Sequence, residues 1–266
     1  TCRTLRKLTI EDPNLVIKID EESGETIMAG MGVLHLDVAV NLIKDAKVEI
    51  VTSEPLINYR ETITGSCEPV MAKSPNRHNK IFMKVEPLEP EIAEMCRDGT
   101  LSEMKDKKEM AQILRDHGWE PDVAKKVMRF DSRGNVMING TKGVQFIDES
   151  TDSLLSGFDE VMSEGGLTKE QVRDCKFTFT HFVPHEDTAH RGLSQLGPAS
   201  RRACLAAFLS AQPMILEPML AIEVRVPTDL IGNVSSVLQG KRGKVIDMQQ
   251  KGATSIVIGE VPAVET

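Results

Sequence analysis

The sequence predicts an α+β protein of three domains, and two observations lead to that fold class. The chain has 266 residues, which exceeds one ordinary small domain and suits two or three. Its two ends also show parts of the same βαββαβ succession, and they flank a longer stretch in which strands and helices alternate differently.

The first 56 residues predict most of one βαββαβ unit. The expected elements are a helix ending near residue 12, strands at 14–20 and 26–30, a helix at 30–46 and a strand at 47–55. The two strands flank a turn at 21–25, which predicts a hairpin. The second helix carries Leu34, Val38 and Leu42 on one face, as expected of an amphipathic helix.

Residues 57–213 predict a larger α+β domain. The expected elements are strands at 57–64, 67–72 and 80–88, acidic helical segments within 86–126, a helix at 148–165, a strand at 175–183 and a helix at 199–212. Alternation along the last strand places Phe177, Phe179 and His181 on one side. Pro198 is expected near the first turn of the last helix, and Pro213 just after its end.

From residue 214 the chain returns to the first pattern. We expect a strand at 216–227, a helix at 228–243 and strands at 244–252 and 254–262. Thr228 or Asp229 would cap the helix and Gly240 would end it. Both end units lack part of the succession, so we expect further residues before Thr1 and after Thr266. A missing helix would cover an apolar face around Ile222, Val224, Ile256 and Ile258.

Composition limits the classes of function. The net charge is −8, with 40% hydrophobic and 4% aromatic residues, which argues against a general nucleic-acid coat protein but leaves room for local basic loops. The absence of a signal peptide or an apolar run of membrane length predicts a cytoplasmic protein without a membrane partner. The cysteines are odd in number and form no CxxC, which favours reduced thiols.

The segment 180–202 holds His181, His185 and His190, and it poses the question of a metal or catalytic site. Pro184 excludes a regular helix between the first two histidines, so the spacing of a metalloprotease helix is not met. The chain also lacks a GxSxG elbow and a GxxxxGK[ST] loop. We therefore expect no metal, no bound cofactor and no catalytic residue in this chain, although an enzyme using the histidine cluster remains an alternative.

Arginines in the same segment point instead to an anionic partner. Arg201 and Arg202 would lie in the first turn of a helix, where the helix dipole disfavours cations. Either an ion pair with acids elsewhere or a bound anion would account for them. His190 and Arg191 would form an exposed tip, and a second basic loop follows Lys73. This combination favours contact with RNA phosphates.

Four stretches carry a resemblance to a known family. "SEPLINYRET", "SPNRHNKIFMKVEPL", "GMGVLHLDV" and "EDTAHRG" resemble the archaeal and eukaryotic elongation factor 2 family, the ribosomal translocation GTPases related to bacterial elongation factor G. The resemblance covers essentially the whole chain. It implies two ferredoxin-like domains, residues 1–56 and 214–266, around a tRNA-mimicking domain, residues 57–213, with a fold like that of ribosomal protein S5.

The resemblance implies a role for each basic loop. In the family the histidine of the His-Arg-Gly tip is converted to diphthamide, and His190 matches it. His185 and His78 match neighbouring residues of that tip, so residues 74–80 should lie beside His190. The remaining contacts expected with the decoding centre involve His78, Arg77, Lys80, His185, Arg191, Gln195, Arg201 and Arg202, and those with the large subunit involve Lys241, Arg242 and Lys244. Leu193 and Ser194 depart from the usual residues after that tip, as do Val33 and Asp37 in the third domain and Pro184 before the tip.

The implied partners are the ribosome, through ribosomal RNA and the factor-binding stalk, and the tRNA–mRNA duplex in the decoding centre. Diphthamide-synthesis enzymes would act on His190 if it is modified. GTP and Mg²⁺ would bind a GTPase domain that these residues do not include. The expected function is GTP-dependent translocation of tRNA and mRNA, and the alternative is a GTPase-less, ribosome-associated or RNA-binding paralogue.

Overall fold

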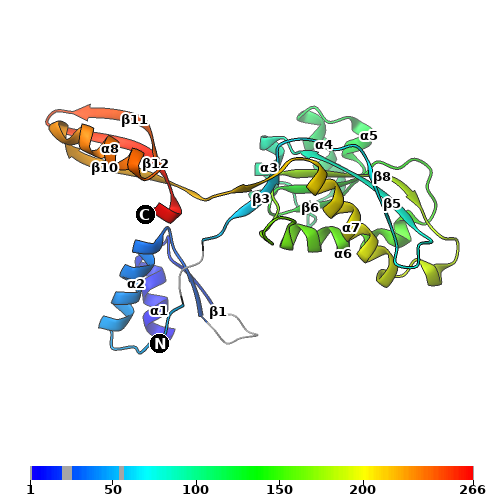
Figure 1. The fold of residues 1–266 in the computed structure, drawn as a ribbon, viewed down its shortest axis with the longest axis horizontal. Coiled ribbons are helices and arrows are strands. Elements are labelled where there is room, and N and C mark those ends of the chain that lie inside the picture. Colours follow the sequence, from blue (N-terminus) through cyan, green and yellow to red (C-terminus); the bar gives the residue numbers. More distant parts are fainter. Residues whose placement is uncertain (1, 20–25, 54–56, 266) are drawn as a thin grey trace. The chain divides into compact units, whose positions relative to one another are not determined.

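The computed structural model describes residues 2–19, 26–53 and 57–265, and the chain forms two compact units of mixed α and β structure (Figure 1). One unit is Tyr59–Leu216, called the middle unit below. The other consists of Thr1–Asn58 and Glu217–Thr266. Within the described residues, no helix combines the length and the apolar character needed to cross a membrane.

The N-terminal segment contains the expected helix, hairpin and second helix. These are α1 (Cys2–Glu11), β1 (Val16–Ile19), β2 (Thr26–Ala29) and α2 (Val33–Asp45). The two strands pair antiparallel, from Val16 opposite Ala29 to Ile19 opposite Thr26. The turn expected at 21–25 lies outside the described residues. Leu8, Leu15, Ala39 and Ile43 form the small buried core.

The face predicted for α2 is not the buried one. Leu34, Val38 and Leu42 are exposed, whereas Ala39 and Ile43 are buried. Both faces of this helix carry apolar residues, so periodicity alone could not choose between them. Entry into α2 is fixed by His35, whose Nδ1 accepts a hydrogen bond from the Met31 N–H at 3.0 Å and whose Nε2 lies 2.6 Å from Asp12 Oδ2.

The strand predicted at 47–55 is absent over the described residues 47–53. Val48 and Ile50 still pack against the small core, so the alternation correctly indicated an inward side. A strand, however, also needs a partner strand to satisfy its backbone groups, and none of the described strands pairs with this segment. The remainder of the prediction, residues 54 and 55, lies outside the described residues.

The C-terminal segment is a three-stranded antiparallel sheet with one helix. The elements are β10 (Met219–Pro227), α8 (Ile231–Gly240), β11 (Lys244–Lys251) and β12 (Thr254–Pro262), in the order β10-β12-β11. Residues 228–230 form a 3₁₀ turn, and α8 begins after Leu230 without a side-chain cap, so the predicted cap at Thr228 or Asp229 is wrong.

The apolar face predicted for this sheet also needs correction, because its four residues divide between two faces. Val224 pairs with Val257, whereas Ile256 pairs with Arg225 and Ile258 pairs with Glu223. Directly paired residues share a face, so Ile256 and Ile258 lie on the other face of the sheet from Val224. The α8 side includes the buried Leu238 and Val257.

The middle unit is built on a five-stranded sheet in the order β4-β5-β8-β7-β6. Its strands are β4 (Val70–Lys73), β5 (Lys80–Pro87), β6 (Val127–Asp131), β7 (Asn135–Asn139) and β8 (Cys175–Val183). Only β7 and β8 run parallel. A separate two-stranded ribbon joins β3 (Arg60–Ile63) to β9 (Pro213–Leu216). The strands β6 and β7 were not predicted.

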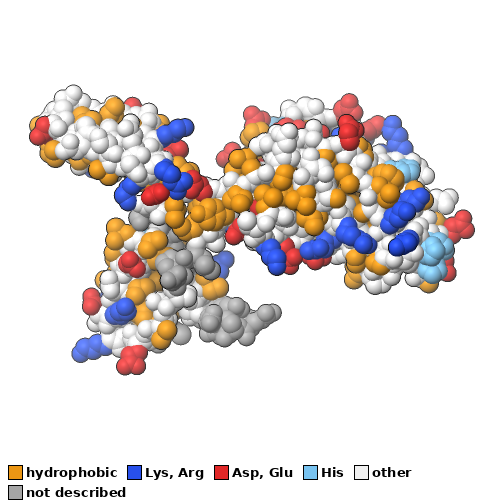
Figure 2. All heavy atoms as spheres, viewed as in Figure 1, with side chains coloured by type: hydrophobic (Ala, Val, Ile, Leu, Met, Phe, Trp, Pro, Cys, Tyr) orange, Lys and Arg blue, Asp and Glu red, His pale blue; other side chains and the backbone are white. Residues whose placement is uncertain are grey.

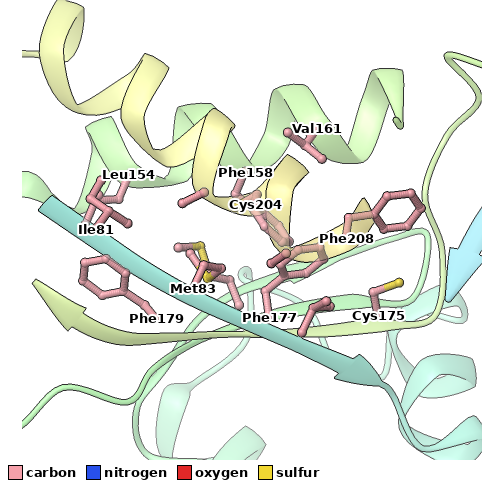
Figure 3. Close-up of a cluster of buried hydrophobic side chains, with 14 of the residues drawn as sticks. Ile81, Met83, Leu154, Phe158, Val161, Cys175, Phe177, Phe179, Cys204 and Phe208 are labelled. Carbon is pink, nitrogen blue, oxygen red and sulfur yellow. The ribbon is translucent and has the colours of Figure 1, made fainter. Parts of the chain in front are cut away.

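Helices cover both faces of this sheet. On one face lie α6 (Ile147–Glu164) and α7 (Leu193–Ser210), and Figure 3 shows their side chains meeting those of β5 and β8. Phe158, Phe177, Phe179 and Phe208 are fully buried there. A second core joins the other face to α3 (Pro90–Arg97), α4 (Lys107–Asp116) and α5 (Pro121–Ala124). The apolar face predicted for the 148–165 helix is confirmed.

A buried carboxylate locks the edge of the middle unit. Glu61 is fully buried, and its oxygens accept hydrogen bonds from the backbone N–H groups of Gly166, Leu167, Thr168 and Glu170, at 2.7–3.1 Å. Burial alone would raise the pKa of this carboxyl, but these N–H groups together lower it. The carboxylate therefore supplies the hydrogen-bond acceptors that these backbone N–H groups would otherwise find in a strand or helix.

Candidate RNA-contacting tip

Three histidines from two distant segments meet at one end of the middle unit. The ring centroids of His78 and His185, and of His78 and His190, are 5.0 Å apart, and those of His185 and His190 are 4.6 Å apart. Figure 2 shows histidine side chains gathered at this end, with Lys and Arg nearby. The prediction that residues 74–80 lie beside His190 is confirmed.

Asn79 joins the segments that carry these histidines. Its side chain is fully buried, donates from Nδ2 to the His190 carbonyl at 2.7 Å and accepts the His185 N–H at 2.9 Å. Asn76 adds a second donor to the His190 carbonyl at 3.2 Å. A carbonyl held by two amides cannot shift without leaving a buried polar group unpaired, so the backbone at His190 is fixed from the neighbouring loop.

Short-range polar contacts shape each of the two loops. Ser74 Oγ accepts from the backbone N–H and Nδ2 of Asn79, at 3.0 and 3.1 Å. Arg77 is exposed and adopts a left-handed conformation, φ 63°. In the other loop Asp187 accepts from the Ala189 N–H and caps the 3₁₀ turn Thr188–His190. Asn and Asp favour such turns because their side chains bond nearby backbone groups.

The structure corrects the expectation for Arg191. Its side chain is only 4% exposed, and its guanidinium stacks 3.9 Å from the centroid of the Phe146 ring. Nη1 lies 3.4 Å from Glu149, and Nε has no hydrogen-bond partner among the described residues. Arg191 therefore anchors the tip to the start of α6. It was expected at the exposed end because its loop neighbours are small and polar, but Phe146 provides a surface that the local sequence does not reveal.

The helix after the tip begins earlier than predicted, which changes the reading of Arg201 and Arg202. Helix α7 starts at Leu193 and includes Pro198 in its interior, so neither arginine lies in a first turn. Arg201 contacts Glu160 at 2.6 Å and Glu164 at 3.5 Å, both on α6. This is the ion-pair alternative. Arg202 donates to the carbonyl of Lys73 at 2.8 Å and thus braces the start of the 74–79 loop.

Two further predicted contacts have distinct positions. Gln195 accepts the Asn76 N–H at 3.0 Å, so it supports the loops from α7. Lys80 is exposed at the start of β5, directly after the 74–79 loop. Among the predicted tip residues, Arg77, His78 and Lys80 are exposed, and His185 and His190 are partly exposed. The positioning role of Asn79 was missed, although the turn residues of "SPNRHN" gave a signal for it.

A β-bulge in β8 turns His181 away from the core. This bulge shifts the register so that Phe82 pairs with His181 while Met83 pairs with Phe179. An extra residue in a strand reverses the side on which later residues point. Phe182 is therefore buried and His181 is exposed, and the expectation that His181 shares the side of Phe177 and Phe179 is wrong.

The middle unit shows no cluster of potential metal ligands among its described residues, and three of its cysteines are buried. Among the described residues, no group of three or more His, Cys, Asp or Glu side chains is arranged to hold a metal ion. His185 Nδ1 instead accepts the Asp187 N–H at 3.1 Å. Burial raises the pKa of Cys96, Cys175 and Cys204 to about 12 in each case. A thiol with such a pKa is a poor nucleophile near neutral pH.

The basic residues of the C-terminal segment are engaged locally. Arg242 forms ion pairs with Glu217 at 3.0 Å and with Glu265 at 2.9 Å, and the hydrogen bonds to Glu265 and Glu217 raise its pKa. Lys241 donates to the Glu265 carbonyl. Lys244 is exposed at the start of β11. Of the three predicted large-subunit contacts, two are thus already paired with groups of the same segment.

Comparisons with known proteins agree along the chain. A family model described as elongation factor G, domain III, matches residues 2–54, one described as elongation factor G, domain IV, matches residues 98–212, and one described as elongation factor G C-terminus matches residues 214–266. The domain IV match includes residues 185–190, to which Asn79 is hydrogen-bonded, and it ends just before β9.

Curated relatives extend this similarity. Elongation factor 2 of Cenarchaeum symbiosum (strain A) is 72% identical over 262 residues, which are 98% of this chain and 36% of the relative. Elongation factor 2 of Sulfurisphaera tokodaii and that of Metallosphaera sedula are 46% and 45% identical over 264 residues, with the same shares covered. The chain thus spans about a third of the length of these relatives. It belongs to the elongation factor 2 family and corresponds to domains III and IV and the C-terminus of the related elongation factor G.

Proposed function

We propose that this chain is the ribosome-engaging region of a translation elongation factor that promotes GTP-dependent translocation of tRNA and mRNA. Support comes from family similarity along almost the whole chain and from the close approach of His78, His185 and His190 at the end of a compact unit. GTP and Mg²⁺ would act in a part of the factor beyond these residues. The expected setting is the cytoplasm, where the factor would contact ribosomal RNA and the factor-binding stalk.

The tip would enter the decoding centre and contact the tRNA–mRNA duplex. The observation that carries this proposal is the fixed backbone at His190, whose carbonyl is held by Asn76 and Asn79 while its ring remains partly exposed. A contact that tests codon–anticodon geometry needs such rigidity, because a mobile loop would adapt to a wrong geometry as well. The exposed Arg77 and Lys80 would neutralise phosphates beside it.

His190 is also the candidate for conversion to diphthamide. The modifying enzymes must reach the imidazole, and its partial exposure on the 3₁₀ turn permits this. Leu193 and Ser194, which depart from the usual family residues, are exposed beside the turn. The intact mass of the protein from its natural host tests the modification directly. An unmodified mass would remove this part of the proposal and leave the ribosomal role standing.

We infer three domains with the boundaries 1–56, 57–213 and 214–266. The outer two would be ferredoxin-like, and the middle one would have the fold of ribosomal protein S5. The C-terminal domain would face the large subunit through Lys244, and through Lys241 and Arg242 if they exchange their present acidic partners for RNA phosphates. An exchange of this kind gains less than a contact made by a free cation.

The alternative is a GTPase-less paralogue that binds ribosomes or other RNA by itself. It is distinguished by the reading frame: an open frame that continues into a GTPase domain upstream eliminates it. Co-sedimentation with purified ribosomes tests the proposal itself. We expect the chain to sediment with ribosomes in a salt-dependent manner, and Arg77→Gln to weaken this association more than the charge-matched Lys107→Gln on α4. Equal effects of the two variants would contradict a ribosome contact at the tip.

A further inference from the structure

The outer face of the sheet in the middle unit is open between the tip and the helices α3 to α5. On β5 and β8, residues that point to this face alternate with fully buried ones that point to the α6 and α7 core. Five of these outer residues are called the outer strip below: Lys80, Phe82, Lys84, Thr178 and His181. Lys80 and His181 are exposed, and the other three are half-buried. The helices that cover this face of the sheet therefore leave the strip accessible.

An aromatic pair lies in the middle of the outer strip. The rings of Phe82 and His181 meet edge to face, with centroids 5.4 Å apart and an interplanar angle of 61°. The β-bulge in β8 places His181 there, since without it this side chain would point to the core. His181 is exposed and Phe82 is half-buried beside it, and accessible aromatic rings on an open sheet face are a platform on which unpaired nucleotide bases stack.

Lysines flank this pair along the strip and beyond it. Lys80 and Lys84 lie two residues before and after Phe82 on the same side of β5. Past Lys84 the strip opens into a cleft of about 590 Å³, whose lining includes Lys84, Lys126, Lys142 and Thr178. Among the described residues, no acid forms an ion pair with Lys80 or Lys142. These cations are available for phosphates on either side of a stacked base.

The far end of the cleft is acidic, and this limits the extent of the basic surface. Lys176 lies between Glu86 at 3.1 Å and Glu89 at 2.9 Å, and Lys84 is 3.5 Å from Glu86. Glu120 and Asp122 line the cleft beside α5. A polyanion would be repelled from this end, so the surface that suits RNA runs from the tip to Lys142 and stops before the acids.

We propose that the outer strip binds single-stranded RNA, with a base stacked on His181 and Phe82 and the flanking phosphates on Lys80 and Lys142. This deepens the proposed function and rests on it, because ribosomal or messenger RNA would supply the strand. The strip begins at Lys80, directly beside the tip, so one strand can contact both. The partner follows from the combination of stacking rings and free lysines, because duplex RNA offers no unstacked base to such a platform.

Fluorescence anisotropy with a short labelled oligouridylate tests this inference on the intact chain. We expect His181→Ala to weaken binding about tenfold, in line with the loss of one stacked base. Lys142→Gln should reduce the slope of log affinity against log salt by roughly 0.7, the value for one phosphate contact of a single strand. The charge-matched Lys107→Gln on α4 should leave both quantities unchanged. Phe82→Leu, which keeps an apolar side chain at a half-buried position, gives a second test of the ring.

Three results would overturn the inference. They are the absence of oligouridylate binding to the wild-type chain at low salt, unchanged binding in His181→Ala and Lys142→Gln, and tighter binding of duplex RNA than of the single strand. Ribosome co-sedimentation of the same variants separates this proposal from the proposed function. A chain that binds ribosomes through the tip but shows no effect of the strip variants would refute the strip alone. A chain that binds oligouridylate through the strip but not ribosomes would refute the ribosomal role instead.

Discussion

The middle unit and the C-terminal segment use charged and polar side chains in different ways. In the middle unit, Glu61 and Asn79 are fully buried and bond backbone groups of distant segments. In the C-terminal segment, Arg242 is 53% exposed and pairs with acids at the surface. Buried polar groups are costly to leave unpaired, whereas exposed ion pairs compete with water. Polar and charged residues that look alike in the sequence can therefore contribute very differently to stability, depending on whether they are buried.

The largest expected effect is at Glu61. Glu61→Ala leaves four backbone N–H groups without their acceptor and should lower the free energy of unfolding of the middle unit by about 4 kcal/mol. Urea denaturation followed by circular dichroism measures it. Glu170→Ala, which changes a partly exposed glutamate of the same loop and keeps its N–H group, is the control and should change the free energy of unfolding little. A similarly small decrease in the free energy of unfolding in both variants would show that the buried carboxylate does not stabilise the middle unit.

The same site predicts a pH dependence. The folded-state pKa of Glu61 is lowered below its ordinary value of 4.5, so its contribution is fully present above that ordinary value. The contribution is lost as the pH falls through the lowered folded pKa. The difference in stability between the wild type and Glu61→Ala should therefore shrink in acid. A difference that stays constant from neutral pH down to acid would contradict this account.

A smaller effect is expected at Asn79. Asn79→Ala removes the donor to the His190 carbonyl and the acceptor of the His185 N–H, and should destabilise the middle unit by about 2 kcal/mol. The amide hydrogens of residues 185–192 should also exchange faster, because this segment loses its two hydrogen bonds to Asn79. Hydrogen exchange followed by mass spectrometry reports on this segment. Protection like that of the wild type would mean that Asn76 alone holds the tip.

The next smaller effect is expected at Arg191. Arg191→Ala should lower the free energy of unfolding by about 1 kcal/mol, because it removes the contact with the Phe146 ring. An exposed tip arginine would change stability little, so thermal denaturation distinguishes the two positions. Arg77→Ala, an exposed arginine of the neighbouring loop, is the matched control. If Arg191→Ala and Arg77→Ala behave alike in denaturation, then Arg191 does not anchor the tip to α6.

The smallest effect is expected in the C-terminal segment. Arg242→Ala should leave the melting transition unchanged within error, because its two ion pairs are exposed and screened by salt. Raising the salt concentration should likewise have no differential effect on this variant. A clear loss of stability at low salt would remove the contrast between the two regions.

Much of the fold followed from periodicity, and the failures have local physical causes. The antiparallel strands β1 and β2 and the helix α6 have strong sequence patterns, and turn residues mark the ends of these elements in the sequence. The strand β7 was missed because Asn135–Asn139 is buried on both faces and shows no alternation. The start of α7 was placed too late because Pro198 resembles a residue of a first helical turn.

The site was predictable in its residues but not in its contacts. The approach of His78 to His190 followed from the family resemblance, and the polar loop residues indicated turns. The burial of Arg191 depends on Phe146, and the pairing of Arg201 depends on Glu160, both distant in sequence. The position of His181 depends on a single bulge, for which "CKFTFTHFV" gives no signal. Such contacts arise only when separate segments pack.

The most direct test of the account is photo-crosslinking from position 78 in the ribosome complex. A photoreactive amino acid replaces His78, which is exposed beside His190, and an identical probe at position 107 on α4 is the control. The account predicts crosslinks from position 78 to RNA of the decoding centre in the small subunit, and none to those nucleotides from position 107. Crosslinks from position 78 only to the large subunit, or the same pattern from both positions, would contradict it.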